Sequence, residues 1–274
     1  SSINLETYDE WKDEEGFIED VMRFLDNVLT DFINRAPDSF KNAKYAAMRE
    51  RSVGLGVMGF HSFLQKKSIP LESVMSKVWN NKIFKHIQTG VDKASKKLSE
   101  ERGACPDAEE YGFKERFSNK TAIAPTASIS IICGGASPGV EPVAANSYTH
   151  KTLSGSYNVR NRYLKEILKK YEKDNDEVWS SITTNQGSVK HLDFLTQKEK
   201  DVFKTAFELD QRWIIELGAD RTPYISQAQS INIFLPADVH KKDLHQIHFQ
   251  AWKKGLKSLY YCRSKSIQRA ENVN

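Results

Sequence analysis

The segment 124–130, Ala-Pro-Thr-Ala-Ser-Ile-Ser, combines a proline with small and hydroxyl-bearing residues. An apolar lead-in at 121–124 precedes it, and a second rigid turn, Gly-Val-Glu-Pro, follows at 139–142. Small side chains leave backbone N–H groups accessible, so amides and hydroxyls together can bind phosphate oxygens. Runs of Thr, Ser, Pro and Gly more often form only a strand end and a loop. The residues alone therefore leave two interpretations open, an anion-binding loop and an ordinary turn.

A second motif, Gly54-Leu-Gly56-Val-Met-Gly59, matches the G-x-G-x-x-G pattern of dinucleotide-binding loops. That fingerprint requires a strand before the first glycine, whereas the lead-in at 46–52 is charged and helical in character. We therefore expect these glycines to allow close helix packing. A stand-alone NAD(P)-binding oxidoreductase that uses this segment is kept as the alternative function.

Two adjacent tyrosines, Tyr260 and Tyr261, end an apolar run, and Arg263 and Lys265 follow them. Successive side chains of a strand point to opposite faces, so such neighbours usually have one ring in the core and one on the surface. Tyrosine can also lose a proton and an electron together, so stacked tyrosines can pass a radical through a protein. The pair is thus either structural or a radical relay.

Candidate metal ligands are scattered along the chain. The seven histidines form no H-E-x-x-H motif, and Cys105, Cys133 and Cys262 form no C-x-x-C pair. An odd number of widely spaced cysteines predicts reduced thiols in the cytosol rather than a disulfide framework or a zinc site. We expect no metal site.

The composition, 39% hydrophobic and 28% charged over 274 residues, is that of a soluble globular protein. No apolar run reaches the roughly 20 residues that span a bilayer, and no signal peptide is recognisable at the N-terminus. A formal net charge of +4 does not by itself predict nucleic-acid binding, although a basic helical DNA-binding protein is a third hypothesis. Because the chain starts with Ser in a strand-like segment, we expect it to be a piece of a longer protein.

Apolar residues at helical spacing predict helices at 17–33, 44–48, 60–66, 83–98, 163–171, 197–217 and 244–254. Gly103 and Gly218 are expected to end the helices that precede them, and Thr196 to cap the one that follows it. Strands are predicted at 121–124, 230–235 and 256–261, and a surface loop at 173–191. Short strands among long helices favour a helix-rich α/β architecture, and nothing requires a second domain.

Six segments, in this order, resemble blocks of the large (catalytic) subunits of class I ribonucleotide reductases of the phage and bacterial type. They are 51–59, 102–106, 124–142, 148–155, 227–232 and 252–261. The resemblance covers roughly the last third of such a subunit. It implies that 1–274 is a single domain, the C-terminal half of a ten-stranded α/β barrel. Members of the family reduce ribonucleoside diphosphates to deoxyribonucleoside diphosphates for DNA synthesis.

The resemblance also implies roles for two sets of residues. The substrate diphosphate would be held by Pro125, Thr126, Ala127, Ser128 and Ile129. The radical would pass through Tyr261 and then Tyr260 toward the thiyl cysteine.

The same resemblance places the thiyl cysteine and the effector sites in a preceding part of the subunit, and none of the three cysteines matches an active-site position. We therefore expect the chain to be inactive alone and to bind no cofactor directly. It would need an N-terminal fragment of the same subunit and a small (beta) subunit with a di-metal/tyrosyl radical. A thioredoxin or glutaredoxin would supply the electrons. No membrane or direct nucleic-acid partner is implied, and the location is cytoplasmic, in the host cell if a phage encodes the chain.

Overall fold

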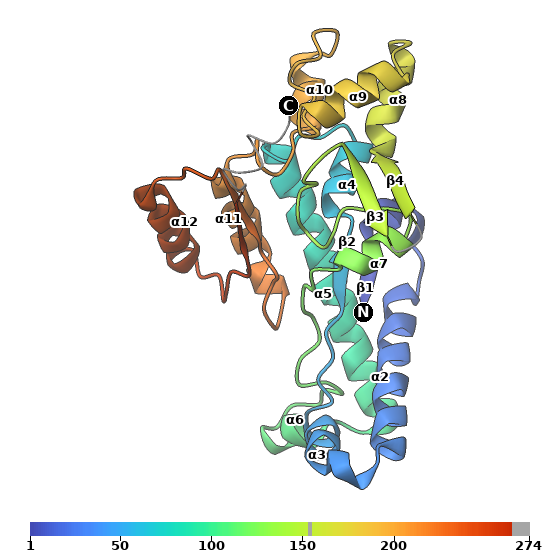
Figure 1. Ribbon diagram of the computed structural model, residues 1–274. Helices are drawn as coiled ribbons and strands as arrows, with labels where there is room; N and C mark the ends of the chain where they lie inside the picture. Colours follow the sequence, from blue (N-terminus) through green and yellow to red (C-terminus); the bar gives the residue numbers. More distant parts are fainter. Residues whose placement is uncertain (153–154, 265–274) are drawn as a thin grey trace.

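The computed structural model describes residues 1–152 and 155–264, so the parts of our predictions that fall on Leu153, Ser154 and 265–274 lie outside it. The helices (Figure 1) are α1 Tyr8–Trp11, α2 Phe17–Arg35, α3 Lys41–Glu50, α4 Phe60–Lys66, α5 Val74–Arg102, α6 Pro106–Glu110, α7 Ala127–Ile132, α8 Arg162–Lys170, α9 Asp176–Thr184, α10 Gln197–Val202, α11 Gln211–Arg221 and α12 Lys241–Lys253. The strands are β1 Ser2–Asn4, β2 Gly56–Met58, β3 Ser147–Thr152, β4 Gly155–Arg160, β5 Ile233–Leu235 and β6 Cys262–Ser264.

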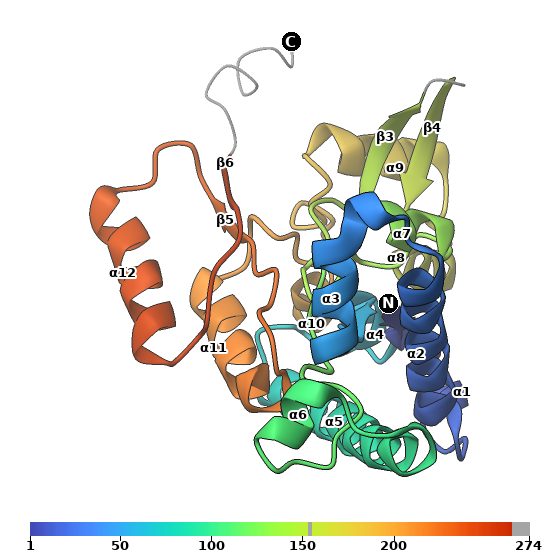
Figure 2. The same cartoon turned by 90° about the horizontal axis from the view of Figure 1, so that it is seen from below.

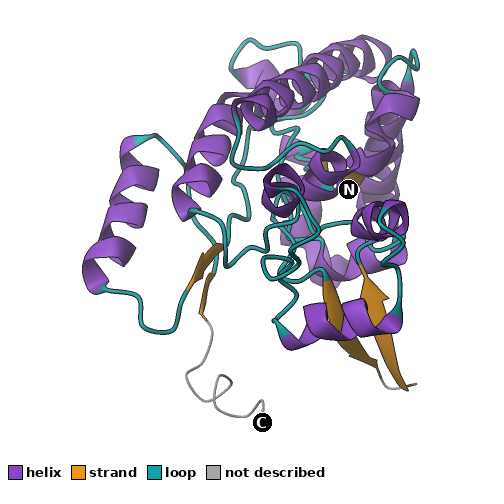
Figure 3. Ribbon diagram, turned by 90° about the horizontal axis from the view of Figure 1, so that it is seen from above, coloured by secondary structure: helices purple, strands orange, loops and turns teal. Residues whose placement is uncertain are grey.

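Short parallel segments lie side by side in sequence order and form the centre of the fold. β1 pairs with β2. Leu55, which precedes β2, forms a parallel bridge with Thr121, and Ile123 forms the next one with Gln229. β5 then pairs in parallel with β6. Parallel neighbours need long crossover connections, and here helices supply them, as Figure 3 shows. The prediction of a helix-rich α/β half-barrel is confirmed.

The two longest helices, α2 and α5, pack against each other along the molecule (Figure 1). Met22 of α2 and Val91 of α5 are buried in the main hydrophobic core. Gly90 permits the close approach, because a Cβ there would lie 2.6 Å from Cδ1 of Ile18. These two helices therefore form one closely packed pair.

The structure confirms the helices predicted at 17–33, 44–48, 60–66, 83–98, 163–171 and 244–254, which are α2, α3, α4, α5, α8 and α12. Gly103 ends α5 and Thr196 caps α10, as predicted. The single helix predicted at 197–217 is wrong, because α10 and α11 are separate and Gly218 lies inside α11. A Cβ at Gly218 would lie 2.7 Å from Cδ1 of Ile231, so this glycine lets α11 approach the strands.

Four other predictions of secondary structure differ from the structure. The strand predicted at 121–124 is limited to isolated parallel bridges at Thr121 and Ile123, and the strand predicted at 230–235 covers only Ile233–Leu235. The segment 173–191 is not a surface loop, because it contains α9, whose Trp179 and Ile182 are buried in a second hydrophobic cluster with residues of α8. The strand predicted at 256–261 begins only at Cys262. Figure 2 shows β5 and β6 beside α11 and α12, on the side of the molecule away from α2.

The glycine motif serves strand packing and not helix packing, which corrects our expectation. Gly56 lies within β2, where a Cβ would come 2.3 Å from the carbonyl oxygen of Ala122. Gly54 faces the Cβ of the same alanine at 3.1 Å. Only Gly59 caps a helix, α4, with a φ of 79°. The first two glycines thus allow the neighbouring backbone segment to approach, and they do not form the turn between a strand and a helix that a dinucleotide would need.

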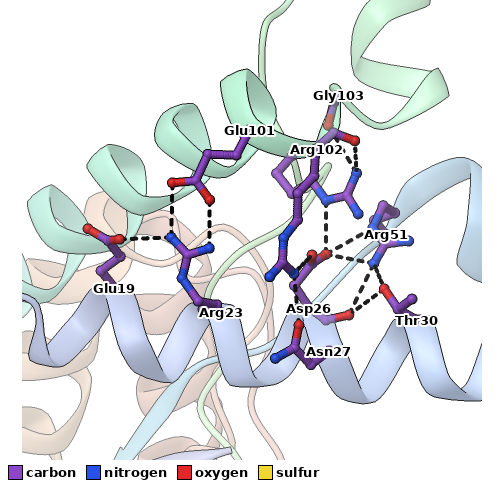
Figure 4. A network of polar contacts seen from close by, with 10 residues as sticks. Glu19, Arg23, Asp26, Asn27, Thr30, Arg51, Glu101, Arg102 and Gly103 are labelled. Carbon is purple, nitrogen blue, oxygen red and sulfur yellow. Dashed lines mark hydrogen bonds and ion pairs between the residues drawn. The ribbon is translucent and has the colours of Figure 1, made fainter.

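A buried carboxylate, Asp26 of α2, joins α2 to the ends of α3 and α5 (Figure 4). Its Oδ1 accepts hydrogen bonds from Arg51 Nη2 at 2.6 Å and Arg116 Nε at 2.9 Å, and its Oδ2 accepts one from Arg102 Nη1 at 2.7 Å. Burial by itself would raise the pKa of Asp26. The hydrogen bonds from Arg116, Arg102 and Arg51 outweigh that effect and keep this pKa below its usual value.

A buried histidine, His61 of α4, accepts a hydrogen bond at Nδ1 from the Val143 N–H at 3.0 Å. Burial lowers its pKa from 6.5 to about 3. A depressed pKa means that the neutral ring stabilises the fold at pH values above 6.5, and that this contribution is lost as the pH falls toward 3. The difference between these two pKa values corresponds to about 5 kcal/mol of folding stability, lost completely only below pH 3.

We therefore expect the free energy of unfolding to fall between pH 6.5 and 4.5, and His61→Gln to remove most of this slope. Urea unfolding at several pH values measures it. His191, which is partly exposed and whose pKa burial lowers less strongly, provides the control, because His191→Gln should leave the slope nearly unchanged. An equal slope in wild type and His61→Gln would contradict the assignment.

Candidate phosphate loop and tyrosine pair

The segment 124–130 forms the start of α7. Thr126 precedes the helix with a φ of 52°, and its buried hydroxyl accepts the Gly139 N–H at 2.7 Å. Ala127, Ser128 and Ile129 are exposed in the first turn. The first N–H groups of a helix have no acceptor within it, so those of this turn are available to an external acceptor. This turn therefore exposes three backbone amides and the Ser128 hydroxyl, while the Thr126 hydroxyl is buried and bonds the second turn at Gly139.

The second turn, 139–142, lies against the candidate phosphate loop, 124–130. Gly139 has a φ of 51°, and a Cβ there would lie 2.9 Å from the carbonyl oxygen of Ala124. Just before this turn, Ser137 and Ser62 of α4 each accept the other's backbone N–H with the side-chain hydroxyl, at 3.1 and 2.9 Å. The two turns and α4 therefore form one connected unit.

The rings of Tyr260 and Tyr261 are in contact. Their centroids are 4.1 Å apart with an interplanar angle of 54°, and each residue is about half exposed. The hydrogen bond with Tyr261 raises the pKa of Tyr260. Arg263 lies over the Tyr261 ring at 5.9 Å. Strand alternation would have put these rings on opposite faces, so the local backbone needs an explanation.

A bulge in the pairing between the tyrosine segment and the β5 segment brings the rings together. The Ile233 N–H donates to the Tyr261 carbonyl at 2.9 Å, and a regular parallel ladder would next pair the Tyr261 N–H with the Ile231 carbonyl. The Tyr260 N–H takes that carbonyl instead, at 2.8 Å. The tyrosine segment therefore has one extra residue here, which is the definition of a bulge and re-aims its side chains.

Because of this bulge the Tyr261 N–H has no ladder acceptor, and the Asn232 side chain, bonded to Glu141, takes that place. Asn232 Oδ1 accepts the Tyr261 N–H at 2.9 Å, and its Nδ2 donates to Glu141 Oε1 at 2.5 Å. Both side chains are buried. Burial raises the pKa of Glu141, although the Asn232 hydrogen bond and the charge of Arg263 act in the opposite direction. Since Glu141 belongs to the turn that Thr126 holds, contacts run continuously from the phosphate loop to the tyrosine pair.

A neighbouring cavity of about 380 Å³ is lined by 134–138, which follow α7, and by Glu6, Arg162 and Tyr163. The Tyr163 hydroxyl donates to Glu6 Oε1 at 2.8 Å. Sequence reasoning missed these residues, because nothing in their spacing relates Glu6 to Tyr163. The cysteines are all free, and no group of three or more His, Cys, Asp or Glu side chains in the described ranges could hold a metal.

The profile of the family described as "Ribonucleotide reductase, barrel domain" matches residues 1–115 and 107–262. The chain belongs to this family. Among curated relatives, it is 50% identical to the ribonucleoside-diphosphate reductase large subunit of Invertebrate iridescent virus 6, over 100% of this chain and 29% of the viral protein. It is 44% identical to the large subunit of Invertebrate iridescent virus 3, over 100% of this chain and 44% of that protein.

A solved structure agrees with this membership of the ribonucleotide reductase family. The Actinobacillus ureae class Id ribonucleotide reductase alpha subunit superposes with a TM-score of 0.90 at 39% identity, covering 99% of this chain and 50% of that one. The chain thus spans half or less of the length of each of these three relatives. The resemblance inferred from the six sequence blocks is confirmed, and the stand-alone NAD(P) oxidoreductase is not supported.

Proposed function

We propose that this chain is part of the catalytic subunit of a ribonucleoside-diphosphate reductase, and that it supplies the substrate-phosphate loop and the tyrosine relay. The observation that carries the proposal is the ring contact between Tyr260 and Tyr261, connected through Glu141 to the loop at α7. An ordinary strand would separate these rings. A radical relay needs them close together, so the bulge fits that role.

The chemistry proposed for the whole enzyme also needs the rest of the catalytic subunit, a small subunit and a reductant. The remainder of the subunit, on the same or a separate polypeptide, would supply the thiyl cysteine that attacks the ribose. A small (beta) subunit with a di-metal/tyrosyl centre would supply the oxidising equivalent, and a thioredoxin or glutaredoxin the electrons. Tyr261 and then Tyr260 would each lose a proton and an electron in turn. By itself, residues 1–274 would be inactive, and the complex would act in the cytoplasm.

Phosphate binding would use the exposed first turn of α7. The N–H groups of Ala127, Ser128 and Ile129 and the Ser128 hydroxyl would donate to the diphosphate, and Pro125 would fix the approach of the chain to the turn. In the part of the chain that the structure describes, no helix is long and apolar enough to cross a membrane. The decisive experiment combines the complete catalytic subunit, its small subunit and a reductant, and measures deoxyribonucleoside diphosphate formation. No product would refute the proposed function.

Ser128→Ala should raise the KM for the ribonucleoside diphosphate about fivefold to tenfold, with kcat little changed. One charge-assisted hydrogen bond is lost, which is worth about 1 to 1.5 kcal/mol. Steady-state kinetics measure the split. Ser130→Ala is the matched control, because Ser130 lies in the same helix but is buried and its hydroxyl only bonds the Ala127 carbonyl at 3.3 Å. An unchanged KM in Ser128→Ala would contradict the assignment of the loop.

A further inference from the structure

We propose that Asn232 is the positioning residue of the tyrosine pair, holding the bulge that keeps the rings of Tyr260 and Tyr261 in contact, and that Glu141 fixes its orientation. This inference rests on the proposed function, since it explains how the relay is built. Asn232 has no role in transferring the radical itself. It acts through the backbone of Tyr261.

The first argument is the unusual acceptor of the Tyr261 N–H. In a regular parallel ladder that N–H would bond the Ile231 carbonyl, but the Tyr260 N–H occupies it. A buried or half-buried backbone donor without an acceptor destabilises the fold, so the Tyr261 N–H needs a substitute acceptor. The Asn232 Oδ1, at 2.9 Å, is that substitute.

The second argument is that Glu141 fixes the orientation of the Asn232 carboxamide by accepting a hydrogen bond from its nitrogen. Asn232 is 1% exposed, and its Nδ2 donates to Glu141 Oε1 at 2.5 Å. With the amide nitrogen directed to Glu141, the amide oxygen must face Tyr261. Glu141 is itself fixed by the turn that Thr126 holds at Gly139. The orientation of Asn232 therefore depends on the same turn that positions the phosphate loop.

Without the side-chain acceptor, the regular ladder becomes the better arrangement. The Tyr261 N–H would then bond the Ile231 carbonyl in place of the Tyr260 N–H, and the tyrosine segment would no longer contain the extra residue of the bulge. Adjacent side chains would then point to opposite faces, which separates the two rings. Loss of Asn232 should therefore affect radical transfer more than substrate binding, because the phosphate loop keeps its own Thr126–Gly139 contact.

The test uses the complete catalytic subunit with its small subunit and reductant, and the variant Asn232→Leu. We expect kcat to fall about tenfold or more, with KM for the ribonucleoside diphosphate within about threefold of wild type. Electron paramagnetic resonance with a more easily oxidised tyrosine analogue at position 260 should show a matching loss of radical at that position. Amide hydrogen exchange of the same subunit should show the Tyr260 N–H exchanging about tenfold faster, because the Tyr261 N–H takes its acceptor, the Ile231 carbonyl.

The conservative variant Glu141→Gln provides the control, because a glutamine oxygen keeps an acceptor for the Asn232 amide. It should retain the exchange protection of Tyr260, and its kcat should fall less than that of Asn232→Leu. If Asn232→Leu does not fold, which circular dichroism would show, Asn232→Ala takes its place because it only removes atoms.

Each outcome decides between the two proposals. If wild type forms no deoxyribonucleotide, the proposed function fails, while hydrogen exchange still tests the role of Asn232. If folded Asn232→Leu keeps wild-type kcat, radical yield and Tyr260 protection, the positioning role is overturned.

Discussion

Tyr260→Phe should abolish ribonucleoside diphosphate reduction, lowering turnover roughly a thousandfold or more, equivalent to at least ~4 kcal/mol in the barrier. Phenylalanine has no phenolic proton, so it cannot be oxidised by losing a proton and an electron together. The change removes a single oxygen atom from a half-exposed side chain, and the ring still fills the same space beside Tyr261. The fold should therefore be preserved, and the loss would be specific to radical transfer.

The measurement is deoxyribonucleotide formation by the complete enzyme, with substrate binding assayed separately. Tyr111→Phe is the matched control, because Tyr111 is 80% exposed and follows α6, which is remote in sequence from the tyrosine pair. It should have wild-type turnover. Substantial reduction activity in Tyr260→Phe, with normal incorporation of the small subunit, would exclude Tyr260 from the relay.

The second large effect concerns folding. Asp26→Asn should lower the free energy of unfolding by about 3 to 5 kcal/mol, because it leaves the charges of Arg51, Arg102 and Arg116 without their shared carboxylate. The side chains of Arg51 and Arg116 are only 9% and 11% exposed, so water cannot replace the lost partner well. Urea unfolding at pH 7 measures the difference.

A nearby surface ion pair between α2 and α5 gives the comparison. Arg23 donates to Glu101 at 2.6 Å, and 39% of the Glu101 side chain is exposed, so Glu101→Gln should destabilise the fold much less than Asp26→Asn. A loss in Asp26→Asn as small as that in Glu101→Gln would show that the arginines are solvated after all. Figure 4 shows both carboxylates between α2 and α5, each facing its arginine partners.

Local sequence signals predicted the helices well, because each depends on apolar spacing within a few turns. The periodicity at 17–33 and the glycine after α5 were sufficient for these elements. The predictions that failed are those in which a tertiary contact determines the local structure. Gly218 continues a helix because Ile231 lies against it, and Gly56 belongs to a strand because the Ala122 backbone lies 2.3 Å from its ideal Cβ.

For the site, the sequence by itself determined the family and the presence of two adjacent tyrosines, and it predicted the phosphate segment at 124–130. Only the tertiary structure decided how these parts work together. The bond between Asn232 and Glu141 joins residues 91 positions apart, and the one between Thr126 and Gly139 joins two turns. Spacing along a chain reports local geometry alone. The ring contact of Tyr260 and Tyr261 contradicts strand alternation and exists because a distant side chain, Asn232, accepts the N–H that the bulge displaces.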